Sequence, residues 1–207
     1  MEKGWVGRAV FESGLIVIGV VLGFIVNEWR EGRAAAAEAA RSLDRIVAEI
    51  ELNRSRIKRI LPYHQRVAAE LADFDYSTLA NEEGVQTILV EALFGDIATE
   101  GVGDLILQDE AWRTALEQDA LAAADFSTLT RIASLYELTL SGPNASWRAI
   151  IDQIDEQASF TPAETVPALK RMTLKYQNLV AQEKYVLEEI DRALAEVQGP
   201  TGRQSHE

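Results

Sequence analysis

The most apolar stretch of the chain lies near the N-terminus and holds no polar side chain from residue 14 to residue 26. Ala9, Val10 and Phe11 precede it. A helix from residue 9 to residue 29 would be about 31 Å long at ~1.5 Å per residue, enough for the ~30 Å of a hydrocarbon core. The residues expected to form this anchor are Leu15, Ile16, Val17, Ile18, Val20, Val21, Leu22, Phe24, Ile25, Val26 and Trp29.

Three interpretations fit this apolar run. A secretory signal peptide needs small residues soon after the apolar core, but Asn27, Glu28 and Trp29 follow here. A buried core helix of a soluble protein is compatible with the short uninterrupted run. An uncleaved single-pass anchor fits the extended length and the bracketing tryptophans, Trp5 and Trp29, because tryptophan is enriched at membrane interfaces. We therefore expect a membrane anchor, in which Gly19 and Gly23 would allow close helix–helix contact.

Apolar residues continue beyond the anchor at the alternating three- and four-residue spacing of a helix seam. The same spacing leads back into the anchor, so one continuous helix is predicted to leave the membrane. Pro62 is predicted to end or kink this helix. The seam consists of Leu43, Ile46, Ile50, Asn53, Ile57 and Ile60, of which the first five are assigned to helix–helix contact.

A second seam occurs late in the chain. Its helix is predicted to begin at the capping box of residues 161–164, or at Thr165 because of Pro167, and to stop at Gly199. The two long helices could bury their seams against each other as an antiparallel hairpin, which we favour, or in a parallel coiled coil between copies with Asn53 setting the register. The second seam consists of Leu169, Met172, Tyr176, Leu179, Glu183, Val186, Ile190, Ala193 and Val197.

The middle of the chain is predicted to form shorter helices over residues 83–94, 110–124, 128–140 and 147–154, with Ser127 as an N-cap and a stop at residues 141–144. The absence of a strand pattern predicts an all-α fold. We expect one N-terminal transmembrane helix that continues into a long helix. This long helix would form an antiparallel hairpin or coiled coil, with a small acidic helical bundle inserted. The expected divisions are an anchor (1–31), a basic long helix (32–66), an acidic middle region (67–160), a C-terminal helix (161–198) and a disordered tail (199–207).

Composition narrows the function. The 207 residues include 20 Lys+Arg and 33 Asp+Glu, a formal net charge of −13, and no cysteine. The missing cysteines exclude a disulfide scaffold and thiolate chemistry, and the acidic balance argues against nucleic acid as a partner. Residues 67–130 hold one basic residue, Arg113, against fourteen acidic ones. The basic stretch at residues 53–59 is expected to pair with this acidic region, to attract anionic lipid or to remain a solvated helix face.

The motifs do not indicate a metal-binding or catalytic site. The spacing of the acidic residues around Gly101 does not match a calcium-binding loop. The two histidines, His64 and His206, are expected to have surface or capping roles. We therefore expect no catalytic residue, metal or cofactor. The acidic residues around that glycine are Asp96, Glu100, Asp104, Asp109 and Glu110.

Three segments carry a resemblance to a known group. An acid precedes the apolar run and Asn27-Glu28-Trp29 follows it; the next segment reads Leu43-x-x-Ile46-x-x-Glu49-Ile50-x-x-Asn53; the third runs from Ala111-Trp112-Arg113-Thr114-Ala115-Leu116 to Leu135-Tyr136. In these segments the chain resembles a group of uncharacterised bacterial single-pass membrane proteins of unknown function. The resemblance implies the inner membrane, a cytoplasmic N-terminus and a periplasmic bulk. It implies no activity.

Together these features predict a non-enzymatic, membrane-anchored structural or interaction protein. Its partners would be the lipid bilayer and either other subunits of an inner-membrane complex, respiratory or photosynthetic among the candidates, or further copies of itself. The alternative is a membrane-anchored sensor whose acidic helical region binds a ligand or a cation.

Overall fold

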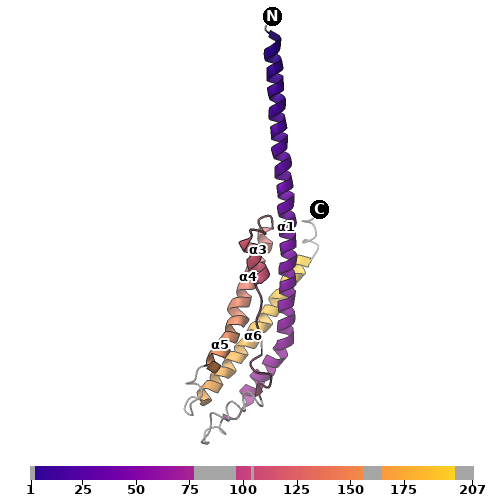
Figure 1. Ribbon diagram of the computed structural model, residues 1–207. Helices are drawn as coiled ribbons and strands as arrows, with labels where there is room; N and C mark the ends of the chain where they lie inside the picture. Colours follow the sequence, from indigo (N-terminus) through magenta and orange to yellow (C-terminus); the bar gives the residue numbers. More distant parts are fainter. Residues whose placement is uncertain (1–2, 77–96, 104, 156–164, 199–207) are drawn as a thin grey trace. The chain divides into compact units, whose positions relative to one another are not determined.

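The computed structural model describes residues 3–76, 97–103, 105–155 and 165–198, and the regular elements in these ranges are all helical (Figure 1). The all-α prediction is therefore confirmed. The helix predicted over residues 83–94, the capping box at 161–164 and the tail at 199–207 lie outside the described residues. The chain divides into two compact units, residues 1–46 with 111–125 and residues 47–110 with 126–207.

The first helix, α1 (Lys3–Asp73), runs without interruption from the apolar run through the first seam (Figure 1). It contains Pro62 and continues beyond it to Asp73. Of the two alternatives at Pro62, the helix end is therefore wrong, and the kink stays a prediction. Proline removes one backbone hydrogen bond inside a helix. Tyr63, His64 and Val67 are buried directly after the proline, and this packing compensates for the lost bond.

The first unit contains the N-terminal part of α1 and a short second helix, α3 (Glu110–Glu117), most of which lies in this unit. The helix was predicted to reach residue 124. It ends earlier, and Asp119 has a positive φ of 50° in the turns that follow. Small residues dominate the buried set of this unit, which comprises Ala39, Ser42, Ile46, Ala115, Ala120 and Leu121.

The second unit is a bundle of α4 (Phe126–Thr139), η3 (Leu140–Asn144), α5 (Ala145–Asp155), α6 (Thr165–Gln198) and the part of α1 beyond residue 46. The helix α6 packs against α4, η3 and α5. Its described residues begin at Thr165, one of the two predicted starts, whereas the other, at residues 161–164, lies outside the described residues. Its seam is buried from Leu169 to Ala193, which confirms the periodicity read from the sequence.

The predicted stop at residues 141–144 is wrong. These residues form the π-helical turn η3, which leads directly from α4 into α5. A π-helical turn is wider than an α-helical one, and it accommodates Pro143, which has no amide hydrogen to donate. A side chain at Gly142 would place its Cβ 2.8 Å from Gln182 Oε1, so this turn approaches α6 closely.

Contacts between α1 and α6 follow opposite residue orders along the two helices. Arg54 Nε lies 2.5 Å from an oxygen of Asp191, and His64 Nδ1 lies 2.7 Å from Glu183 Oε1. Further along α1, the carbonyl oxygen of Leu71 accepts a 3.4 Å hydrogen bond from the Thr173 hydroxyl. Rising numbers on α1 meet falling numbers on α6, so in this unit the two helices run antiparallel.

Candidate functional site

The apolar run forms an exposed surface on α1. Each of the eleven residues assigned to the anchor is exposed. Their relative solvent-accessible surface ranges from 48% at Val21 to 71% at Phe24. The helix contains a window long and apolar enough to cross a membrane, and none of that window is buried. A core helix would be mostly covered by the rest of its chain. The described residues therefore do not support the core-helix interpretation, whereas membrane anchors and signal sequences share this apolar N-terminal pattern.

The glycines predicted to contact another helix have free space around them. A Cβ atom added at Gly19 or Gly23 would meet nothing within 4 Å. Within the described part of the chain, their faces are therefore uncovered. Contact through these glycines stays a prediction about another helix in the membrane.

The other predicted contact residues lie within the protein. Ile46, Ile50, Asn53 and Ile57 are buried, and Leu43 is half-buried. The side-chain amide of Asn53, which was the candidate for setting the register of a parallel coiled coil, is engaged within its own chain. Its amide nitrogen donates to the carbonyl of Gln108 at 2.7 Å, and its amide oxygen accepts from the Gln108 backbone N–H at 2.8 Å.

Asn53 is one of several side chains that hold the extended segment 105–109. Asn144 makes the same pair of bonds to Leu107, the residue before Gln108. Its amide oxygen accepts from the Leu107 N–H at 3.3 Å, and its amide nitrogen donates to the Leu107 carbonyl at 3.4 Å. Arg56 donates to the carbonyl of Ile106 at 2.8 Å. We call this arrangement the asparagine clamp. It satisfies backbone groups that an unpaired extended segment would otherwise bury without partners.

Replacement of Asn53 by alanine is expected to destabilise the second unit by about 2–4 kcal/mol. The change leaves the half-buried N–H and C=O of Gln108 without their partners, at about 1–2 kcal/mol for each group, the lower part of the range for a fully buried group. Urea unfolding of the full chain in detergent would measure the loss. Asn178→Ala is the matched control, because Asn178 is exposed and donates a hydrogen bond to the side chain of Ser146 rather than to a backbone group. Equal effects of the two substitutions would contradict the role of the clamp.

A buried carboxyl–phenol contact joins α1 to α4. The Tyr136 hydroxyl donates to Glu49 Oε1 at 2.6 Å, and both side chains are buried. Burial is the main cause that raises the pKa of Tyr136 far above its usual 10, and the hydrogen bond to Glu49 adds to it. Tyr136 is therefore a permanent donor here.

The largest departure from the sequence analysis is His64. It was expected at the surface or in a cap, but its side chain has no solvent exposure and lies against that of Glu183, which is equally buried. The prediction for His64 is wrong because the spacing of the first seam continues past Pro62. His64 is four residues from Ile60 and three from Val67, so it takes a core position.

The basic stretch makes contacts with two regions. Arg54 pairs with Asp191 of α6, and Arg56 reaches the backbone of the acidic middle region at Ile106. Lys58 and Arg59 are exposed. Within the described ranges, the basic stretch thus meets the acidic region at a backbone carbonyl oxygen.

Acidic residues of the middle region do not assemble a metal site in the described ranges. No group of three or more His, Cys, Asp or Glu side chains that could hold a metal ion occurs there. Asp96 and Asp104 lie outside the described residues. Glu100 is exposed.

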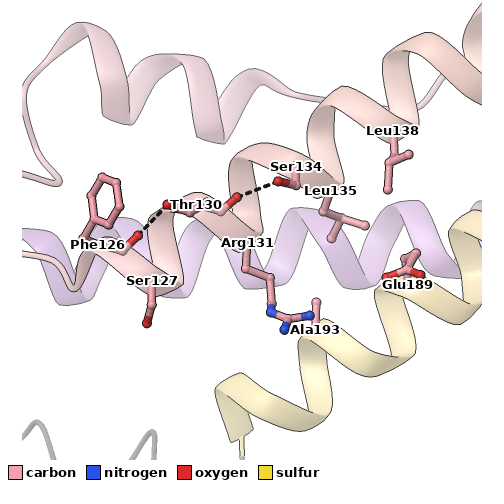
Figure 2. Close-up of a pocket in the computed structure, with 9 residues that line it drawn as sticks. All are labelled: Phe126, Ser127, Thr130, Arg131, Ser134, Leu135, Leu138, Glu189 and Ala193. Carbon is pink, nitrogen blue, oxygen red and sulfur yellow. Dashed lines mark hydrogen bonds between the residues drawn. The ribbon is translucent and has the colours of Figure 1, made fainter.

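A shallow open pocket of about 490 Å³ lies between α4 and α6 (Figure 2). The hydroxyls of Thr130 and Ser134 donate to the carbonyls of Phe126 and Thr130, so both are committed to their own helix. Arg131, which also lines the pocket, lies 2.6 Å from an oxygen of Glu196. Phe126 is 81% exposed at the start of α4 and is the most prominent apolar group beside the pocket.

Two features of the polar core carried signals in the sequence. Glu183 was placed on the second seam, which already indicated a buried carboxyl group in need of a partner. Extension of the first seam beyond Pro62 would have supplied His64 as that partner. Asn144 carried no such signal, because its role depends on the path of segment 105–109.

Comparison of the chain with protein-family models, with curated proteins and with solved structures gives no match.

Proposed function

We propose that this chain is a non-enzymatic, membrane-anchored interaction protein. In this proposal the apolar run of α1 lies in the bilayer, and the helical unit at the other end of α1 is presented to partners. Those partners are other subunits of a bacterial inner-membrane complex, which the chain joins as an accessory or scaffolding subunit, or further copies of the chain.

The exposed apolar surface of residues 11–29 carries the proposal. Large apolar side chains are uncovered on all sides of α1 there, from Phe11 to Trp29. Soluble monomers rarely expose a contiguous apolar surface of this extent, whereas a lipid-facing helix is apolar all round. The uncovered faces of Gly19 and Gly23 support helix–helix contact inside the bilayer.

The second unit supports an interaction role because its ionisable groups serve its own packing. Glu49, Glu183 and His64 are buried in contacts between helices, and Arg54 and Arg131 pair with acidic residues of α6. Such contacts hold helices together as a rigid module. A rigid helical module on a membrane anchor suits docking to a partner.

Extraction in a mild neutral detergent, followed by native-size separation and mass spectrometry, tests the proposal. Co-migration with a defined set of other subunits in fixed stoichiometry is expected of an accessory subunit. Migration alone at a small multiple of the chain mass of 22.9 kDa is expected of a homo-oligomer. A soluble monomer recovered without detergent would contradict the anchor and with it the proposed function.

A further inference from the structure

The core of the second unit contains an ionisable pair that packing alone does not require. The side chains of His64 and Glu183 have no solvent exposure, and their closest atoms are 2.7 Å apart. The second carboxyl oxygen of Glu183, Oε2, is buried and has no hydrogen-bond partner among the described residues. Apolar residues of similar volume would stabilise a helix interface at least as well as a buried pair with an unsatisfied oxygen.

The hydrogen-bond geometry shows how many protons the pair holds. His64 Nε2 lies 3.3 Å from the carbonyl oxygen of Val102, which can only accept, so this contact is a hydrogen bond when Nε2 carries the hydrogen. The contact between Nδ1 and Glu183 Oε1 then requires a second hydrogen, on either the ring or the carboxyl group. With that shared proton the pair is uncharged overall. Without it, a lone pair of the ring faces either the carboxylate or the carbonyl.

Among the described residues, the groups around the pair are two tyrosine rings and backbone carbonyls, with one arginine behind the nearer ring. On α1, the Tyr63 ring centroid lies 5.8 Å from that of His64, with Arg66 on the far side over the Tyr63 ring. On α6, the Tyr176 ring lies edge-on to His64 at 6.0 Å. From residues 97–103, the Gly101 carbonyl accepts from the Tyr63 hydroxyl.

Among the charged groups near Tyr63, Arg66, Glu70 and Glu100 affect the pKa of that phenol. In the described part of the chain, the charged group that affects the Glu183 carboxyl is His64. The proton of the pair is thus controlled within the pair.

The pair also controls the approach of the neighbouring segment. Gly103 has a φ of 76°, and a Cβ atom there would lie 2.8 Å from His64 Nε2 and 3.1 Å from Ile60 Cδ1. The backbone at residues 102–103 is therefore packed directly on the imidazole ring. The Trp147 side chain of α5 donates to the Gly103 carbonyl at 2.7 Å. A movement of His64 that displaced Gly103 would therefore also affect this hydrogen bond to α5.

We propose that His64 and Glu183 form a proton-operated latch, which fastens α1 to α6 and to residues 101–103 while the shared proton is present and loosens these contacts when it is lost. The latch acts inside the second unit and does not depend on which partner the chain binds.

The direction of the pH dependence follows from Glu183. Burial raises the pKa of its carboxyl group above 4.5, and the contact with His64 opposes this only in part. The folded chain therefore keeps this proton at pH values at which the unfolded carboxyl has lost it. The stability that this proton contributes is present in full below pH 4.5 and falls as the pH rises through the raised pKa.

Urea unfolding of the full chain in neutral detergent, at a series of pH values from about 5 to about 9, tests the latch against Glu183→Gln. Glutamine keeps the shape and donates an amide hydrogen to Nδ1 at every pH. We expect the wild-type midpoint to fall with rising pH relative to that of Glu183→Gln. Parallel pH curves for the two chains would overturn the proposal.

Two further variants keep the result interpretable. Glu49→Gln is the matched control, because Glu49 is also a buried carboxyl that accepts a hydrogen bond from another helix, from the Tyr136 hydroxyl. Its curve is expected to run parallel to that of the wild type, and a Glu49→Gln curve that instead matches Glu183→Gln would overturn the assignment to this pair.

The double variant His64→Leu with Glu183→Leu covers the case in which Glu183→Gln folds poorly. It is expected to lose the same pH dependence, and retention of that dependence would overturn the proposal.

A spectroscopic readout separates the latch from a purely structural contact. The chain has two histidines, so His206→Ala leaves His64 as the only imidazole in a ¹⁵N spectrum. In the Glu183→Gln background we expect the Nε2–H form of His64, with Nδ1 as the acceptor. A hydrogen on Nδ1 and none on Nε2 would contradict the proton count on which the latch rests.

Discussion

A chain that carries both Val17→Arg and Val21→Arg is expected to leave the membrane fraction. Both positions are exposed near the middle of the apolar run, on one face of α1. An arginine at the centre of a membrane helix costs about 2.5–3.5 kcal/mol on insertion scales, so two cost roughly 5–7 kcal/mol. Each 1.4 kcal/mol changes an equilibrium about tenfold, which makes the loss of membrane partition roughly several thousandfold to a hundred-thousandfold. Carbonate extraction followed by quantitation of the chain in pellet and supernatant would measure it.

The control for this experiment is Ala35→Arg with Ala36→Arg. These positions are also exposed on α1 but lie beyond the apolar run. The control chain is expected to stay in the membrane fraction. If both double variants stay in the pellet, the apolar run does not hold the chain in the bilayer, and its exposed surface must be covered by another protein.

Replacement of Ile57 by alanine is expected to destabilise the second unit by about 2–5 kcal/mol. Ile57 has no solvent exposure and lies on the first seam, so the change removes buried methyl groups and leaves a cavity in the core. A typical domain is stable by only 5–15 kcal/mol, so the loss is a large part of the total. Urea unfolding followed by circular dichroism of the full chain in detergent would measure it.

Leu52→Ala is the matched control for Ile57→Ala. Leu52 lies on the same helix, five residues away, and is 43% exposed. Its replacement is expected to change the stability by no more than about 0.5 kcal/mol. A large loss from Leu52→Ala would show instead that this face of α1 is covered in the folded protein.

The two seams show which features of the fold can be predicted from residue spacing along one helix. Leu179, Val186 and Ile190 were expected in a helix core from their spacing alone, and all three are buried. Spacing is informative there because a helix returns each third or fourth residue to the same face. A proline is a weaker guide: α1 does not end at Pro62, and Pro143 lies inside η3. The packing of the residues that follow determines whether a proline ends a helix.

The contacts between polar side chains in the core could not be predicted from the local sequence pattern. Asn144 lies in a segment whose composition is typical of a helix stop, yet it is buried and holds Leu107, 37 residues earlier in the chain. Nothing within a few residues of either one indicates this contact. His64 and Glu183 are 119 residues apart. Only Glu183 was placed on a seam by helical periodicity, and the contact between the two depends on the register of α1 against α6.

The sequence by itself determined that the chain is helical, that its N-terminal helix is apolar on every face, and which positions of α6 are buried. These properties depend on spacing along one helix and on the cost of exposing apolar side chains to water. The tertiary structure alone decided which polar side chains meet in the core: the asparagine clamp, the Tyr136–Glu49 contact and the His64–Glu183 pair. The physical reason is that a hydrogen bond needs its two groups within about 3 Å, and only the packing of distant segments sets that distance.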